Sequence, residues 1–177
     1  MLSLREDNRP LKLVLWFALV AALVAVDQYT KHLAVTMLKP IGSYPLWEGV
    51  FHLTYVENTG AAFGILRDHR WVFMLLSTIA VVAIVIYLIV RSKQTSLFEG
   101  IMLSLIAAGG IGNMIDRIKD GFVVDFLDFT LIDFAVFNVA DSFVTVGAAL
   151  MMVYLIASEI KAAKNAPSKA PSQEKQQ

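Results

Sequence analysis

Four long runs of apolar residues, bounded by polar or charged positions, dominate the hydropathy pattern of the chain. They cover residues 12–31, 71–90, 96–115 and 138–158. Each has roughly 20 residues, the length that an α-helix needs to cross a hydrocarbon core about 30 Å thick. A backbone in lipid must satisfy its own hydrogen bonds, so each run is predicted to be a transmembrane helix. The pattern therefore predicts a mainly α, integral membrane fold: a four-transmembrane-helix bundle.

The segments between the runs have a different pattern. Residues 40–70 alternate short apolar and aromatic stretches with Pro and Gly, which predicts a small interfacial β segment between helices 1 and 2. Residues 117–137 are apolar and acidic without a clear period. No internal repeat is visible, so we expect one membrane-embedded domain over residues 1–160. Residues 161–177 are poor in apolar side chains and are predicted to form a disordered cytoplasmic tail.

The first apolar run follows three basic residues, as the apolar part of a signal peptide would. It lacks a good Ala-x-Ala cleavage site and leads directly into the polar segment 27–31, so we interpret it as a retained span. Basic residues near the span ends indicate the orientation. Nine of the fifteen lie on one side, which predicts that both termini are cytoplasmic: Arg5, Arg9, Lys12, Arg91, Lys93, Lys161, Lys164, Lys169 and Lys175.

Composition supports the membrane assignment and narrows the possible functions. The chain is 57% hydrophobic, with a mean hydropathy of +0.64, well above an ordinary soluble domain. Its 15 basic and 15 acidic residues balance, so no net field attracts nucleic acid. The absence of cysteine excludes disulfides, a thiolate nucleophile and Cys-ligated metal sites.

Polar and ionisable residues lie beside the spans in four groups, all at the predicted outer face. A charge at the centre of a membrane helix costs roughly 2.5–3.5 kcal/mol, so such residues usually mark function. The candidate site residues in these groups are Asp27, Lys31, Asn58, Gly60, Asn113, Asp116, Arg117, Asp125, Asn138, Ala140 and Asp141.

Several of these residues, taken alone, also have a structural explanation. The Asp27–Lys31 spacing suits an interfacial ion pair on one helix face. Asp116 and Arg117 are predicted to form an ion pair that caps a helix at the headgroups. Asp141 would stand in the first turn of a helix, where capping and the helix dipole favour aspartate.

Asn58 and Asp125 differ in how readily a structural role explains them. Asn58 precedes small residues in a common turn pattern, which is weak evidence by itself. Asp125 is a carboxylate in an apolar stretch and is harder to explain structurally.

Taken together, the groups indicate a pair of carboxylates that share a proton. Two carboxylates held close cannot both ionise easily, so one acts as base and the other as acid near neutral pH. Such a pair can activate water against a peptide carbonyl without a metal or cofactor. The three histidines show no His-Glu-x-x-His pattern, which argues against a zinc peptidase. A Ser142–Lys31 dyad stays open but has no support in the sequence.

Two other classes of protein remain alternatives. A small transporter or proton relay also uses intramembrane carboxylates, but it should place them near the bilayer midplane, often in related halves. A non-catalytic scaffold would use the polar groups only as helix caps.

At these residues the chain resembles the bacterial lipoprotein signal peptidase (signal peptidase II) family. The resemblance covers about residues 11–156 and is specific because four motifs occur in order between the spans. They are Asp27-Gln-Tyr-Thr-Lys31, Asn58-Thr-Gly-Ala-Ala-Phe-Gly64, Gly109-Gly-x-Gly-Asn-x-x-Asp-Arg117 with Gly121-x-Val-Val-Asp-Phe126, and Phe137-Asn-Val-Ala-Asp-Ser142.

The resemblance implies an aspartic endopeptidase at the outer leaflet of the bacterial inner membrane. Its substrate would be a prolipoprotein, cleaved just before the diacylglyceryl-modified cysteine, with Asp125 and Asp141 as the catalytic pair. The other candidate residues would bind substrate or support the site, and the inhibitor globomycin would bind between the two aspartates. The segment 127–136, which the family uses partly as a lid, is short here and lacks a firm match.

Overall fold

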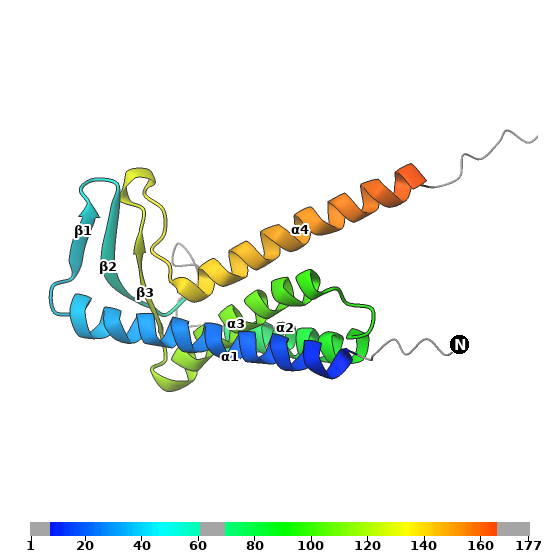
Figure 1. The fold of residues 1–177 in the computed structure, drawn as a ribbon. Helices are drawn as coiled ribbons and strands as arrows, with labels where there is room; N and C mark the ends of the chain where they lie inside the picture. The colour runs from blue at the N-terminus through cyan, green and yellow to red at the C-terminus, as the bar shows by residue number, and fades with distance from the viewer. Residues whose placement is uncertain (1–7, 61–69, 166–177) are drawn as a thin grey trace, which may run out of the picture.

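The structure, a computed structural model, describes residues 8–60 and 70–165. Within them, four helices are long and apolar enough to cross a membrane, as the sequence predicts. They are α1 (Arg9–Leu33), continued by the π-helical turn η1 (Ala34–Leu38), α2 (Arg70–Arg91), α3 (Leu97–Lys119) and α4 (Val139–Asn165). Figure 1 shows the described ends of α1 and α4 at the same end of the bundle.

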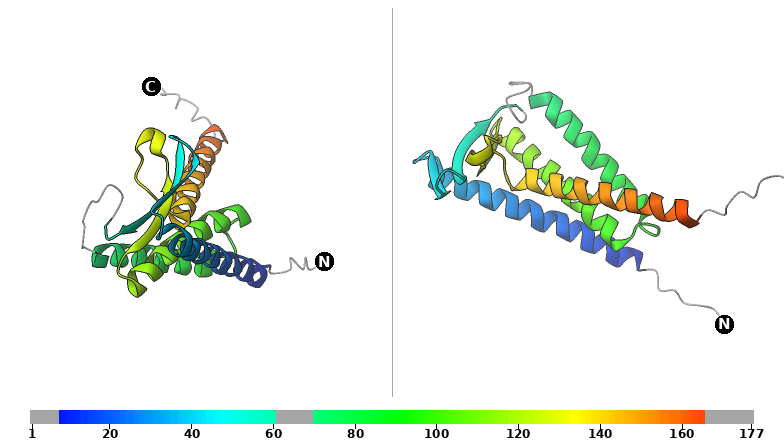
Figure 2. Two further views of the ribbon diagram at one scale, coloured as in Figure 1. Left: turned by 90° about the vertical axis from the view of Figure 1, so that its left-hand side faces the viewer. Right: turned by 90° about the horizontal axis from the view of Figure 1, so that it is seen from above.

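A three-stranded antiparallel sheet lies across the opposite end of the helices (Figures 1 and 2). Its order is β1 (Ser43–Trp47), β2 (Phe51–Asn58) and β3 (Val123–Asp128). The first two strands confirm the β segment expected between the first two spans. The third strand was not predicted: it comes from the segment between α3 and α4 and pairs with β2, Val56 opposite Asp125.

The sequence concealed β3 because both faces of this strand are covered. Residues 123–126 are all buried, so apolar and polar positions do not alternate there as they do in a half-exposed strand. Val124 and Phe126 pack against Ala34 and Leu38 of η1 in one apolar cluster. The cluster attaches the sheet to the end of α1 and fixes the position of β3.

Small residues allow the helices to approach one another closely. A side chain at Gly109 would collide with the backbone of Ala140 on α4, and one at Gly112 would collide with the carboxylate of Asp27 on α1. At the other end of α3, Gly100 gives room to the buried Trp16 ring. Helix packing in lipid depends on such close contacts, so these glycines bring the polar residues of three helices together.

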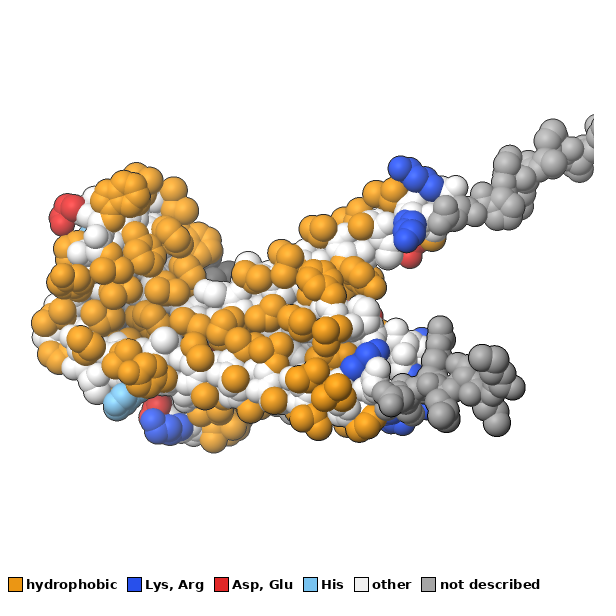
Figure 3. Space-filling model, viewed as in Figure 1, with side chains coloured by type: hydrophobic (Ala, Val, Ile, Leu, Met, Phe, Trp, Pro, Cys, Tyr) orange, Lys and Arg blue, Asp and Glu red, His pale blue; other side chains and the backbone are white. Residues whose placement is uncertain are grey.

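The outer surface of the bundle suits a lipid environment. Figure 3 shows apolar side chains along the visible sides of the helices, whereas Lys and Arg lie mainly towards the end that carries the termini. Exposed apolar residues occur on all four spans, for example Val14, Leu75, Phe98 and Val153. The buried ionisable residues of the helices, Asp27, Lys31, Asp116 and Arg117, are instead gathered on the inside, near the sheet.

Candidate active site

Asp125 lies in the middle of β3 and is almost completely buried, with 1% of its surface exposed. Its Oδ2 accepts a hydrogen bond from the Asn58 amide on β2 at 2.8 Å, and its Oδ1 accepts one from the Asn138 amide at 2.7 Å. Burial is the main cause that raises the pKa of Asp125 to about 7. The Asp141 carboxylate also raises this pKa, whereas the hydrogen bonds from the two amides lower it. Asp125 therefore takes up and releases its proton near neutral pH.

Asp141 stands in the first turn of α4, where the cap predicted from the sequence does form. The Asn138 backbone N–H donates to Asp141 Oδ2 at 3.2 Å, and the Asp141 N–H donates to Asn138 Oδ1 at 2.9 Å. This reciprocal pattern is that of a capping box. The other oxygen, Oδ1, accepts a hydrogen bond from the Asn113 amide at 2.7 Å. The cap therefore uses Oδ2 of Asp141, and Oδ1 is left to contact Asn113 in the interior of the protein.

Two asparagines connect the carboxylates. Because the Asn138 amide oxygen already accepts the Asp141 N–H, its amide nitrogen is directed towards Asp125 and towards Asn113 Oδ1, 3.1 Å away. Every oxygen of the two carboxylates accepts a hydrogen bond from an Asn side chain or backbone. Residues from β2, α3 and the start of α4 therefore hold the pair in fixed orientations.

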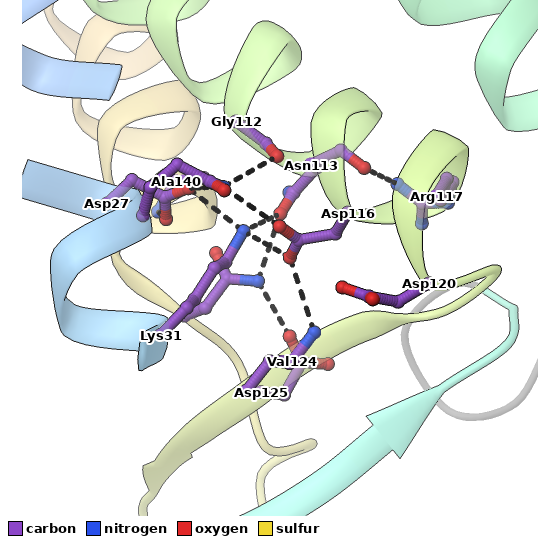
Figure 4. A network of polar contacts seen from close by, with 12 residues as sticks. Asp27, Lys31, Gly112, Asn113, Asp116, Arg117, Asp120, Val124, Asp125 and Ala140 are labelled. Atoms are coloured by element: carbon purple, nitrogen blue, oxygen red, sulfur yellow. Dashed lines mark hydrogen bonds and ion pairs between the residues drawn. The ribbon is translucent and has the colours of Figure 1, made fainter. Parts of the chain in front are cut away.

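A buried ion cluster lies beside the pair. Figure 4 shows Lys31 of α1 pointing towards Asp27, Asn113 and Asp116. Its Nζ is 3.0 Å from Asp27 Oδ2 and 2.8 Å from Asp116 Oδ2, and it donates to Asn113 Oδ1 at 2.8 Å. The Asp27–Lys31 pair was predicted, and Lys31 also explains the orientation of Asn113. A donor-only ammonium faces the amide oxygen, so the amide nitrogen faces Asp141.

The ion cluster also holds the elements that carry the two aspartates. Asp27 Oδ1 accepts the backbone N–H of Ala140 at 3.0 Å, and Asp116 Oδ2 accepts that of Val124 at 3.4 Å. The first contact fixes the start of α4, and the second fixes β3 beside Asp125. Asp116 is therefore not the partner in the headgroup ion pair expected from the sequence, because its cation is Lys31 of another helix.

Arg117 lies on the last turns of α3 with only 9% of its surface exposed. Its guanidinium donates to the backbone oxygens of Gly60, at 3.1 Å, and Asn113, at 3.3 Å, and stacks 5.2 Å from the Phe73 ring centre. Gly60 in turn donates its N–H to Asn58 Oδ1 at 2.9 Å. Arg117 therefore connects α2, α3 and the end of β2 around the carboxylate pair.

Both carboxylates line one cavity of about 620 Å³. Its polar end contains Asp125, Asp141, Asn58, Asn113 and Arg117. The remaining walls come mainly from apolar or small residues of α2, α3, α4 and the preceding segment, among them Phe73, Gly109, Gly110, Phe134, Phe137 and Val144. A cavity with a few convergent polar groups and an extended apolar wall suits a substrate that is part polar backbone and part hydrocarbon.

The structure brings every predicted site residue into this region. Gly60 and Ala140 contribute backbone groups, and the others contribute side chains. Residues 61–64 of the second motif lie outside the described residues. Gln28 was missed as a site residue, although it follows Asp27 in the first motif: its amide donates to Asp116 Oδ1 at 2.8 Å and to Asp27 Oδ2 at 3.2 Å. Over residues 8–60 and 70–165, no group of three His, Asp or Glu side chains could hold a metal ion.

The segment that follows β3 covers one side of the cavity. It contains a 3-10 turn (Thr130–Ile132), after which Asp133 adopts a left-handed conformation with φ 49°. Phe129 stacks on Phe137 with ring centres 5.8 Å apart, and Phe134 meets Phe137 edge-on at 5.8 Å. Phe134 and Phe137 line the cavity. Sequence alone left this segment unassigned because its aromatic contacts join positions without a regular period.

Comparison with solved structures places this fold in the class of bacterial membrane enzymes. One such enzyme, solved by the in meso method at 2.3 Å resolution, superposes with a TM-score of 0.75 and 32% identity over 88% of this chain and 93% of its own. A second, at 1.9 Å, gives a TM-score of 0.69 and 35% identity over 79% and 91% of the two chains.

Sequence comparison identifies the family within that class. Residues 19–157 match the family model described as signal peptidase (SPase) II. Lipoprotein signal peptidases from Caldanaerobacter subterraneus subsp. tengcongensis and Brevibacillus brevis are 48% and 46% identical, each covering 78% of this chain and 93% of the relative. The chain belongs to the signal peptidase II family of peptidases, multi-pass proteins of the bacterial inner membrane that process lipoproteins.

Proposed function

We propose that the protein is an aspartic endopeptidase in which Asp125 and Asp141 activate the attacking water. The observation that carries the proposal is that both carboxylates line one cavity, bridged by Asn138, while burial raises the pKa of Asp125 to about 7. One member of the pair can then be protonated while the other is ionised, as acid and base catalysis requires.

The chemistry follows from this division of protons. Asp141, as carboxylate, takes a proton from water while the water oxygen attacks the peptide carbonyl carbon. Asp125 gives its proton to the carbonyl oxygen, which forms a tetrahedral diol. Asp141 then protonates the leaving nitrogen, a diol hydroxyl returns a proton to Asp125, and the carbon–nitrogen bond breaks. Both carboxyl groups end in their starting states, so the step needs no metal or cofactor.

The lining of the cavity supports the proposal that the substrate is lipid-modified. We infer that the enzyme cleaves prolipoproteins just before the diacylglyceryl-modified cysteine, with the peptide bond beside Asp125 and hydrocarbon along the apolar walls. Asn58 and Arg117 also line the cavity, and the hydrogen-bonding capacity that their internal contacts leave over would hold the peptide backbone. Globomycin would occupy the same space between the two aspartates.

The orientation of the site also belongs to the proposal. Both termini are cytoplasmic and the site opens at the outer leaflet. Two observations support this orientation. Nine of the fifteen basic residues are expected on one side of the membrane. The described ends of α1 and α4 lie together at the end of the bundle away from the sheet (Figure 1). A transporter is less well supported, because the buried ionisable residues near the cavity gather beside the sheet rather than at mid-bundle.

The test is cleavage of a purified, lipidated prolipoprotein by Asp125→Asn, Asp141→Asn and the double variant. Asn keeps the shape of Asp but cannot accept the proton of water, so each single variant should lose about 10² to 10⁴-fold in rate or more. The double variant should be scarcely slower than either single one, because the two residues act as a unit.

Asp128→Asn is the matched control. Asp128 lies on the same strand, but its Oδ2 accepts a hydrogen bond from Thr54 and it does not line the cavity. We expect its cleavage rate to stay close to that of the unmodified protein. Substantial turnover by either Asp125→Asn or Asp141→Asn, in protein with an unchanged unfolding midpoint, would show that the pair is misassigned.

A further inference from the structure

A second cavity, of about 390 Å³, lies in the corner where the end of α1 meets the sheet. Leu33, Met37 and Ile41 line it from the end of the first span and the turn that follows, and Tyr44, Leu46 and Phe126 are among its other lining residues. Apart from the hydroxyl groups of Thr30 and Tyr44, the side chains that line it are apolar. We call this cavity the α1 groove. Its volume lies within the range of about 300–1,000 Å³ that is common for ligand sites.

The α1 groove is separate from the active-site cavity. Successive side chains of a strand point to opposite faces of the sheet. Val123 and Asp125 line the active-site cavity, whereas Phe126 lines the α1 groove. The two cavities therefore lie on opposite faces of β3, and a group bound in the α1 groove would pack behind the strand that carries Asp125.

The α1 groove continues the lipid-facing surface of the first span. Tyr29, Leu33, Met37 and Ile41 follow one another at intervals of four residues and are 64%, 36%, 65% and 59% exposed. Such spacing places Tyr29 and Leu33 of α1 and Met37 of η1 in one stripe along the helix face, and Ile41 follows in the turn after η1. The stripe leads from the membrane-spanning part of α1 to the groove.

The depth of the groove in the membrane follows from the length of the helix. The first span is 30 residues long, or about 45 Å at 1.5 Å per residue, against a hydrocarbon core about 30 Å thick. Counting about 20 residues from Lys12 places the edge of the core close to Lys31. The α1 groove, between Thr30 and Leu46, lies where acyl chains meet the headgroups.

We propose that the α1 groove binds an acyl chain of a bilayer phospholipid. The groove is apolar, is open beside a lipid-facing stripe and begins at the edge of the hydrocarbon core. The chain would pack against Phe126 and so support β3 from the face opposite Asp125. The signal peptide of the substrate is a poorer occupant, because its cleavage site must reach the other face of that strand.

The proposal can be tested with a phospholipid whose acyl chain carries a photoreactive diazirine. The full-length protein would be reconstituted in vesicles of phosphatidylethanolamine and phosphatidylglycerol that contain this probe, irradiated and digested, and the labelled residues would be identified by mass spectrometry. Labels should concentrate in residues 30–46 and at Phe126. Leu33→Trp, which fills the groove, should reduce that labelling at least five-fold.

Val35→Trp is the matched control, since Val35 is 37% exposed, close to the 36% of Leu33, but does not line the groove. It should leave the labelling unchanged. Leu46→Trp, at a residue that is 57% exposed, fills the other end of the groove and gives the answer if Leu33→Trp does not fold.

Two results would overturn the assignment. One is labelling that is no denser in the α1 groove than along α2 and is equal in all variants. The other is loss of the groove labels when excess prolipoprotein is added, which would assign the groove to the substrate. Labelling needs no catalysis and can be repeated with Asp125→Asn protein, so its outcome is independent of the proposed aspartic mechanism.

Discussion

Replacement of Lys31 by Met tests whether the buried ion cluster holds the site together. The Lys31 side chain is 4% exposed and contacts the carboxylates of Asp27 and Asp116 at 3.0 and 2.8 Å. Removal of one partner from a buried ion pair leaves an uncompensated charge and costs about 3–5 kcal/mol. For a chain of this length, that loss should lower the unfolding midpoint by on the order of 10 °C.

Activity should fall as well, by a route that stability alone does not explain. Without the ammonium, only the Asn138 amide, 3.1 Å away, still holds the Asn113 amide oxygen, so Asn113 is less firmly oriented and its hydrogen bond to Asp141 Oδ1, now 2.7 Å long, weakens. We expect Lys31→Met to show a clear loss of cleavage rate even at a temperature where it is fully folded. Lys31→Arg keeps the charge and should recover part of the stability.

The assays are thermal unfolding in detergent and cleavage of a lipidated prolipoprotein. Adding Asp116→Asn to Lys31→Met removes one of the unpaired carboxylates and should raise the midpoint again. Lys39→Met is the control, because the Lys39–Glu57 pair is exposed and an exposed pair contributes little. If Lys31→Met unfolded at the same temperature as Lys39→Met, the ion cluster would not hold the site together.

Three further predictions follow from the site and its orientation. Cleavage should slow as the pH rises through about 7, because Asp125 then loses the proton that it donates. Since the pKa of Asp125 is raised above the ordinary value of 3.8, the folded state should also lose stability as the pH rises from about 4 to about 7. Cleavage rate and unfolding midpoint measured against pH test the two effects. Alkaline phosphatase fused after Lys119 should be active and after Lys93 inactive, and the reverse pattern would place the site in the cytoplasm. Asp116→Asn should lower the cleavage rate and the yield of folded protein, because Asp116 holds Lys31 and the Val124 N–H; full activity with normal stability would contradict that role.

The spans and most site residues could be predicted because their signals are local or carried by motifs. A run of about 20 apolar residues satisfies its backbone hydrogen bonds in lipid by forming a helix, so the number of spans follows from the sequence alone. The Asp27–Lys31 pair follows from helical spacing, and the cap at Asp141 from its place at the start of a span. These are contacts within one element.

Contacts between elements were harder to predict. The partner of Asp116 is Lys31, 85 positions earlier in the chain, and no spacing rule connects the two. The third strand was hidden because a strand covered on both faces shows no alternation, and the bulge between Leu53 and Val56 shifts its register against β2. The α1 groove depends on how the sheet meets η1, which the hydropathy of either segment does not reveal.

The order of the strands has a consequence for the synthesis of the protein. β2 precedes α2 in the chain, but its partner β3 follows α3, so a growing chain displays β2 with one open edge until residue 128 has been made. Asp141 comes later still, and α4 must insert before its carboxylate can meet Asp125. The proposed carboxylate pair therefore comes together only once the last helix has entered the membrane, late in the synthesis of the protein.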